Sequence, residues 1–147
     1  MGPEAQAAIP ALTRALEDSR SSPYQVHYAL ALLKIDRRQA ALAIPVLTNT
    51  LNAARPRVHG AGRAALDVRR QTAAALGEFA AASRAAVAAL ANALGDSDAA
   101  VRQEAAKALG GIGAQAVPIV PALRKVLTDP DEAVGSEATA ALKKIGA

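Results

Sequence analysis

Five arginines in one short stretch are the residues of this chain best suited to bind a charged ligand. The stretch, residues 53–70, contains Arg55, Arg57, Arg63, Arg69 and Arg70. Its only acidic residue is Asp67, so the stretch accounts for the whole net charge of +4. Guanidinium groups form paired hydrogen bonds with phosphates and carboxylates. The stretch, with its one histidine, His59, is therefore a candidate contact surface.

Residues that could stack on nucleic acid bases are scarce. The chain has no Trp, and its aromatic residues are Tyr24, Tyr28 and Phe79. Proteins that bind single strands depend on bases stacked against aromatic rings. We therefore favour a protein contact, or a solvated loop that ends in two structural arginines, for this stretch. Nucleic acid binding through residues 55–70 is kept as an alternative.

No arrangement of residues in the sequence predicts catalysis or metal binding. His27 and His59 have no cluster of carboxylates near them, and a zinc site needs more ligands than two lone histidines supply. The chain has no Cys, which excludes disulfides and thiolate ligands. Ser83 and Ser97 are expected to cap helices, and the glycines near residue 110 to serve close helix contacts and helix ends. We expect a protein that is not an enzyme and has no cofactor.

The composition predicts an all-helical protein. Hydrophobic residues make up 52% of the chain and aromatic residues 2%, and Ala supplies much of the difference. Ala is the best helix former, and alternating β-branched runs, which indicate strands, are missing. No apolar run approaches the roughly 20 residues of a membrane span, so no membrane partner is expected. The N-terminus lacks the pattern of a signal peptide, and a cytoplasmic location is predicted.

A repeat of 33 residues organises the expected helices. Three close copies and one looser copy of a helical pattern are present: Val68–Phe79, Val101–Ile112 and Val134–Ile145, with Tyr24–Ile35 as the looser one. Between them, an Ile or Val is followed three and seven residues later by Leu, as at Ile9, Leu12 and Leu16. Each repeat is therefore a helix pair that must bury its apolar face against neighbouring pairs. In each pair, we call the helix of the 33-residue pattern, such as Val101–Ile112, the first helix. The helix with the Ile or Val and the two Leu residues is the second helix.

About eight antiparallel helices follow from this pattern. First helices are expected near residues 23–35, 67–80, 98–112 and 131–145, and second helices near 4–17, 39–52, 83–94 and 115–127. A basic loop insert at about residues 53–66 lengthens one interval between first helices, and Pro56, Gly60 and Gly62 mark its first part as a loop. Residues 1–147 should form a single domain, an α-α superhelix.

Glycine and proline predict details of the helix ends. Gly113 and Gly146, again 33 residues apart, are expected to end their helices in the left-handed conformation. Pro118 is expected in the first turn of its helix, and Pro121 should bend that helix. Asp129 is expected to cap the last first helix.

These motifs together resemble HEAT-like repeats. The residues that carry the resemblance are Ala108–Gly113 (Ala-Leu-Gly-Gly-Ile-Gly), the run Asp96–Arg102, and Val120–Leu123 (Val-Pro-Ala-Leu) with its variants. The short bacterial variety first noted in phycobilisome lyases is the nearest in length, because other HEAT repeats have about 40–47 residues. The resemblance implies a solenoid that serves as a binding scaffold. An accessory role in chromophore attachment is an alternative that it also implies.

The resemblance further implies a ladder of Asp–Arg contacts that joins successive repeats. Arg69 and Arg102 would supply its arginines, with Asp98 and Asp131 as acidic candidates. The matching positions in the outer copies are a Gln, at position 25, and a Gly, at position 135. The ladder should therefore be broken at both ends.

Two surfaces could contact a protein partner. The resemblance places second helices on the concave side, where a polar column is formed by Arg14, Asn49, Asn92 and Lys125. Solenoids bind extended partners along such columns, although the solvent side of any amphipathic helix gives the same pattern. The overall prediction is a non-catalytic scaffold or adaptor that binds an unidentified protein through this face, the basic insert, or both.

Both ends of the array are expected to be open. The helix expected near residues 131–145 is the last in the chain. Four of its apolar residues are expected to face the side on which a further repeat would pack: Val134, Ala138, Leu142 and Ile145. An open apolar edge predicts head-to-tail self-association of copies, or a fragment of a longer array.

Overall fold

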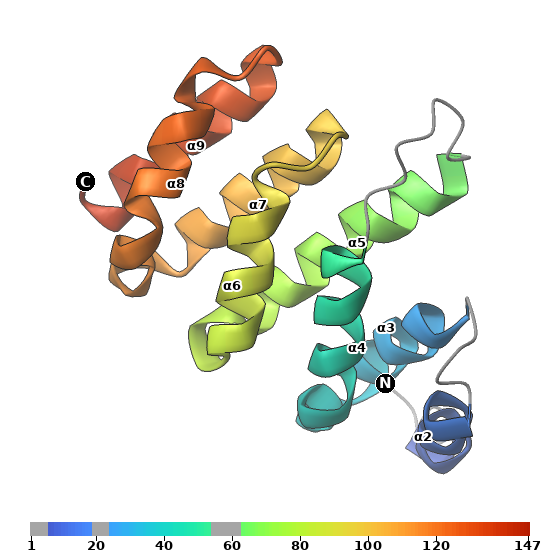
Figure 1. Cartoon of the computed structure of the whole chain (residues 1–147). Coiled ribbons are helices and arrows are strands. Elements are labelled where there is room, and N and C mark those ends of the chain that lie inside the picture. Colours follow the sequence, from blue (N-terminus) through green and yellow to red (C-terminus); the bar gives the residue numbers. More distant parts are fainter. Residues whose placement is uncertain (1–5, 19–23, 54–62) are drawn as a thin grey trace.

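The computed structural model describes residues 6–18, 24–53 and 63–147, and throughout these ranges the regular elements are helices. The first helices are α3 (Gln25–Ile35), α5 (Arg63–Phe79), α7 (Ala99–Gly111) and α9 (Glu132–Ile145). The second helices are α2 (Ile9–Asp18), α4 (Ala40–Asn52), α6 (Arg84–Ala93) and α8 (Val120–Lys125). The helices stack in a row from α2 at one end to α9 at the other (Figure 1). The predicted all-α solenoid is confirmed.

Polar caps fix where several helices begin. The Ser83 side chain accepts a hydrogen bond from the Ala86 N–H at 3.3 Å, which starts α6 as predicted. The Asp98 carboxylate accepts from the Val101 N–H at 3.1 Å and starts α7, and Asp131 does the same for α9. The expectation that Ser97 and Asp129 cap these helices was wrong, because both residues precede the N-terminal residue whose carboxylate reaches the free N–H groups.

Gly113 and Gly146 both adopt the predicted left-handed conformation, but only Gly146 directly ends a helix, α9, as predicted. Gly113 follows the Ile112 cap of α7 and begins the next 3₁₀ helix. Gly113 has a φ of 64° and Gly146 a φ of 85°, both in the left-handed region that residues with a Cβ rarely adopt. The N–H of Gly146 donates to the carbonyl of Leu142 at 3.0 Å, which satisfies a carbonyl of the last helical turn.

The region predicted as one second helix over residues 115–127 is broken into three parts. A 3₁₀ helix covers Gly113–Ile119, α8 covers Val120–Lys125, and a further 3₁₀ helix covers Val126–Thr128. Pro118 lies in the first 3₁₀ helix, and Pro121 lies in the first turn of α8. The predicted roles of the two prolines were therefore wrong. Proline has no N–H, and the first turn of a helix makes no use of one, so Pro121 is tolerated at the start of α8. An α-helix that continued through Pro118 would lose a backbone hydrogen bond there.

The helix α5 begins earlier than predicted, at Arg63, so residues 63–66 of the expected loop insert are helical. This segment, Arg-Ala-Ala-Leu, consists of strong helix formers that follow Gly62. Pro56, Gly60 and Gly62, which mark the predicted loop, lie outside the described residues.

Small residues set a short distance between successive first helices. A Cβ placed on Gly77 of α5 would lie 2.7 Å from the Cβ of Ala108 in α7. A Cβ placed on Gly110 of α7 would lie 2.7 Å from the Cα of Ala141 in α9. The close helix contact expected of Gly110 is confirmed, and it recurs with the 33-residue period.

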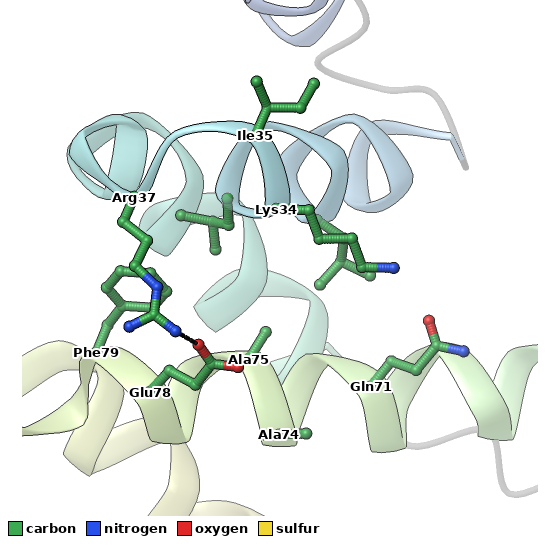
Figure 2. A pocket seen from close by; sticks show the side chains of 10 residues that line it. Lys34, Ile35, Arg37, Gln71, Ala74, Ala75, Glu78 and Phe79 are labelled. Carbon is green, nitrogen blue, oxygen red and sulfur yellow. Dashed lines mark hydrogen bonds and ion pairs between the residues drawn. The ribbon is translucent and has the colours of Figure 1, made fainter. Parts of the chain in front are cut away.

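The packing of α3 on α5 is different, because a large residue occupies the glycine position. Leu33 in the copy Tyr24–Ile35 aligns with Gly77 and Gly110. Leu33 and Leu30 line a groove of about 530 Å³ together with residues of α5. Figure 2 shows this groove between the two helices. The first-helix layer is therefore tight from α5 to α9 and looser between α3 and α5.

The exposed face of α9 is polar. Val134, Ala138, Leu142 and Ile145 are all buried against the rest of the chain, so the expectation that they face outward was wrong. They share register positions with residues that face inward in the other copies, such as Val101 and Leu109. In α7, Ala106 and Gly110 are buried, and Gly110 lies against Ala141 of α9. The residues at the same register positions in α9 are Thr139 and Lys143, and both are exposed. This face thus lacks the apolar surface on which the predicted head-to-tail association depended.

Candidate interaction surfaces

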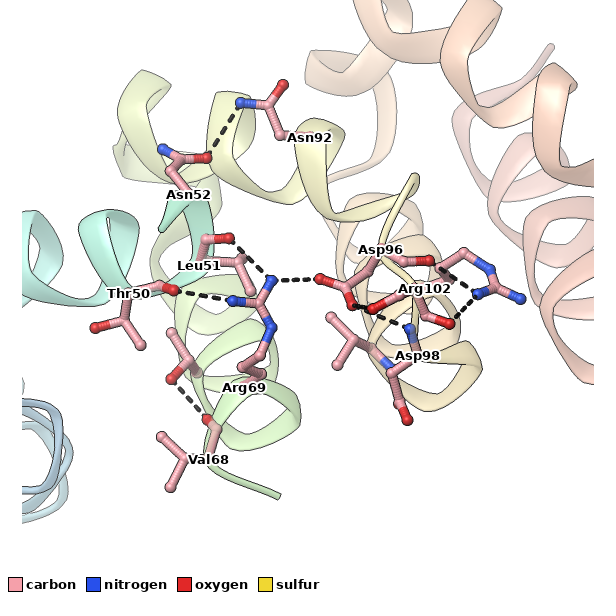
Figure 3. Close-up of polar contacts among 12 residues, drawn as sticks. Thr50, Leu51, Asn52, Val68, Arg69, Asn92, Asp96, Asp98 and Arg102 are labelled. Carbon is pink, nitrogen blue, oxygen red and sulfur yellow. Dashed lines mark hydrogen bonds and ion pairs between the residues drawn. The ribbon is translucent and has the colours of Figure 1, made fainter. Parts of the chain in front are cut away.

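Arg69 joins the ends of two successive second helices. It projects from α5, and its Nη1 and Nη2 donate to the carbonyls of Thr50 and Leu51, at 3.2 and 3.1 Å, where α4 ends. Nη2 also donates to the carboxylate of Asp96, in the turn after α6 (Figure 3). The exposed fractions of the two charged side chains are 8% and 2%, so this ion pair is buried. Arg69 is therefore held by the fold and does not face a ligand.

Arg102 repeats this arrangement one unit later. Its Nε and Nη2 donate to the two carboxylate oxygens of Asp129 at 2.8 and 2.7 Å, a bidentate pair. Its Nη1 donates to the carbonyls of Asp96 and Ser97, at 2.9 and 3.2 Å. The guanidinium thus ties the turn before α7 to the turn before α9.

The acidic partners differ from those expected. Asp96 and Asp129 accept from the arginines, whereas the predicted partners Asp98 and Asp131 cap α7 and α9. Each acceptor also receives the N–H of the residue two places later, Asp98 at 3.1 Å and Asp131 at 2.9 Å. One aspartate of each pair therefore shapes the turn and holds the arginine, and the other starts the helix.

The outer copies carry no arginine at this position. The Gln25 side chain donates to the carbonyl of Leu16 at 3.3 Å, so it contacts the end of the preceding second helix without an acidic partner there. At Gly135, a Cβ would lie 2.9 Å from the carbonyl oxygen of Leu127, so the helix end approaches the backbone directly. Within the described residues the ladder consists of the Arg69 and Arg102 pairs.

A dependence of stability on pH follows from the second pair. The hydrogen bonds from Arg102 hold the pKa of Asp129 below its ordinary value, despite the opposing effect of desolvation. Because the pKa is lower in the folded state, this carboxylate stabilises the fold fully above the unfolded-state pKa of about 3.9. The contribution is lost as the pH falls from there through the folded-state pKa. We expect Asp129→Asn to be less stable at neutral pH and to show a weaker decline below about pH 4.

Urea unfolding followed by circular dichroism, at neutral pH and in steps below pH 4, measures this dependence. Glu132→Gln is the control, since Glu132 is exposed and next to the same turn. It should keep the pH profile of the unmodified chain. Equal profiles for Asp129→Asn and the unmodified chain would contradict the assignment.

Of the basic stretch at residues 53–70, the structure describes residue 53 and residues 63–70. Within this part, the arginines do not gather into one cluster. Arg55, Arg57 and His59 lie outside the described residues, and Arg63 is described only as the first residue of α5. Arg69 is paired with Asp96, as above. Arg70 is exposed on α5, with its Nη2 3.7 Å from a carboxylate oxygen of Asp67. Two of the five arginines thus have acidic neighbours within the fold, which leaves less charge for an external phosphate.

The predicted polar column lies on the surface. Arg14, Asn49, Asn92 and Lys125 are all exposed, on α2, α4, α6 and α8. The helices α4 and α6 pack side by side, and the Asn92 side chain donates to that of Asn52 at 3.1 Å (Figure 3). This amide pair joins the exposed faces of two successive second helices into one surface.

His27 lies exposed on α3, with its ring 6.3 Å from that of Tyr24, measured between centroids. In the part of the chain that the structure describes, no group of three or more His, Cys, Asp or Glu side chains is placed to hold a metal ion. No described helix combines the length and apolar character needed to cross a membrane.

Comparison with known proteins agrees with the helical pairs. Residues 60–120, which include α5, α6, α7 and the 3₁₀ helix that follows, match the family model of HEAT repeats. A search of curated proteins found no significant match to the chain. The match is to HEAT repeats in general, so the short phycobilisome-lyase variety remains a prediction. The stacked helix pairs and this match over residues 60–120 together support the predicted HEAT-like repeat architecture.

Proposed function

We propose that the chain is a non-catalytic scaffold that binds a protein partner along the exposed face of α4 and α6. HEAT repeats are commonly protein-interaction scaffolds. The observation that carries the proposal is the joined surface of Asn49, Asn52 and Asn92, which spans two successive repeats. Exposed amides in an ordered surface can donate to and accept from a partner's backbone without the desolvation cost of a charge.

The two alternatives have less support. Nucleic acid binding through residues 55–70 would rely on the excess of positive charge in that stretch. Two of its arginines, Arg69 and Arg70, already lie next to acidic side chains. No specific observation favours an accessory role in chromophore attachment. Protein binding is therefore the function developed below.

The test compares two charged double variants as bait for proteins from the source organism. Asn49→Glu with Asn92→Glu alters the proposed surface. Ser136→Glu with Thr139→Glu adds the same charge to the exposed face of α9. We expect a protein that the unmodified chain and the α9 variant retain and that the α4–α6 variant loses. With the purified partner, the α4–α6 variant should bind about tenfold more weakly, as for changes near an interface centre.

Two outcomes would overturn the proposal. One is that the bound proteins do not differ between the two double variants. The other is that the bound material disappears on nuclease treatment and that binding falls steeply with salt, which would indicate nucleic acid instead.

A further inference from the structure

The groove between α3 and α5 has the size and lining of a binding site. Its volume of about 530 Å³ lies within the range of about 300–1,000 Å³ typical of small-ligand pockets. The apolar part of its lining comprises Leu30, Leu33, Ile35, Ala74, Ala75 and Phe79. Lys34, Arg37, Gln71 and Glu78 supply the polar part. A groove that exposes both apolar and polar groups favours an amphipathic occupant.

The groove exists because one register position changes. In α5 and α7 the position that meets the next first helix is a glycine, Gly77 or Gly110, and an alanine of that helix closes on it. In α3 the position is Leu33, and the facing alanine of α5 is Ala75. A leucine cannot be accommodated at the distance that glycine allows, so the two helices stay apart. The gap is therefore specific to this pair among the described first helices.

The polar edge of the groove carries an excess of positive charge. At one end, Arg37 forms an ion pair with Glu78, and its guanidinium lies 5.9 Å from the centroid of the Phe79 ring (Figure 2). At the other end, Lys34 and Gln71 lie on the facing helices. Lys34 is exposed and has no ion pair with any described residue. Two cations against one acid make the edge complementary to a carboxylate.

We propose that this groove binds a short helical segment of a partner protein that places apolar side chains against Leu30 and Leu33 and a carboxylate beside Lys34. Amphipathic helices bind hydrophobic grooves in this way, through residues spaced about one turn apart. The site lies in the first-helix layer and uses none of the residues of the α4–α6 surface. It is therefore a second contact, beyond the proposed function.

The test uses a fluorescein-labelled helical peptide of about 14 residues, with Leu at i, i+3 and i+7 and Glu beside that stripe. Fluorescence anisotropy measures its binding to the full chain. Lys34→Glu should weaken binding about tenfold, since it replaces attraction of the carboxylate by repulsion. Lys144→Glu is the matched control, because Lys144 holds the same register position in α9 and is also exposed. It should change binding by less than about twofold.

A second pair of variants tests occupancy of the groove. Gln71→Trp should cover the groove and weaken binding, whereas Thr139→Trp, on the exposed face of α9, should not. The Asn49→Glu with Asn92→Glu variant should bind the peptide normally, so failure of one proposal leaves the other standing. Absence of binding, equal binding of a peptide with Lys in place of Glu, or indifference to Lys34→Glu and Gln71→Trp would overturn the groove proposal.

Discussion

Arg69→Ala is expected to lower the free energy of unfolding by about 3–5 kcal/mol, the usual cost of removing one partner of a buried ion pair. The Asp96 carboxylate is 2% exposed and would remain buried without its counter-ion. The carbonyls of Thr50 and Leu51 would also lose their donors, which weakens the junction of α4 and α5. Urea unfolding followed by circular dichroism measures the loss, because the chain has no Trp to report by fluorescence.

Arg70→Ala is the matched control for this prediction. Arg70 is the next residue of the same helix, its side chain is 52% exposed, and its contact with Asp67 is a weak surface pair. We expect a change within about 0.5 kcal/mol. Adding Asp96→Asn to Arg69→Ala should recover part of the loss, since it removes the uncompensated charge while keeping an acceptor for the Asp98 N–H. Similar effects of Arg69→Ala and Arg70→Ala would show that the ladder does not stabilise the fold.

Gly110→Ala is expected to destabilise the protein by about 2 kcal/mol, within the range for overpacking a close contact. In an exposed helix the same change would stabilise by up to about 1 kcal/mol, because Ala is the better helix former. Here the new Cβ would lie 2.7 Å from the Cα and 2.8 Å from the Cβ of Ala141. The backbone of α9 cannot rotate away as a side chain can, so α9 must move off α7.

The neighbouring glycine provides the control, with the opposite sign. A Cβ on Gly111 meets no atom within 4 Å, and its φ is not in the left-handed region. Gly111→Ala should therefore raise the free energy of unfolding, by up to about 1 kcal/mol. Thermal and urea unfolding of the two variants measure the difference. A stabilising Gly110→Ala would mean that α7 and α9 do not approach as closely as described.

The ladder shows how far sequence reasoning reaches for this protein. The 33-residue spacing of Arg69 and Arg102 marks them as equivalent, but the aspartates recur at the same spacing in pairs, Asp96 with Asp98 and Asp129 with Asp131. Because both aspartates of each pair recur with the same period, the spacing cannot show which of them contacts the arginine. The choice depends on the turn, in which the earlier aspartate folds back on the chain and the later one caps the helix.

The groove was missed for a related reason. Its one sequence signal is Leu33, which stands where the aligned copies have Gly77 and Gly110. The substitution is visible in the alignment of the copies, but its consequence depends on what the position meets in the next helix. Similarly, the inward direction of Val134 and Leu142 became clear only when α9 was packed on α7.

The sequence by itself determined the helical class, the pairing of helices, the period and the glycine positions. These features follow from local preferences and from apolar spacing, which act within one helix or one repeat. The tertiary structure decided the partners of the arginines, the roles of Pro118 and Pro121, the polar face of α9 and the gap between α3 and α5. Each of these depends on atoms brought together from different repeats, where distance in space and not spacing along the chain selects the contact.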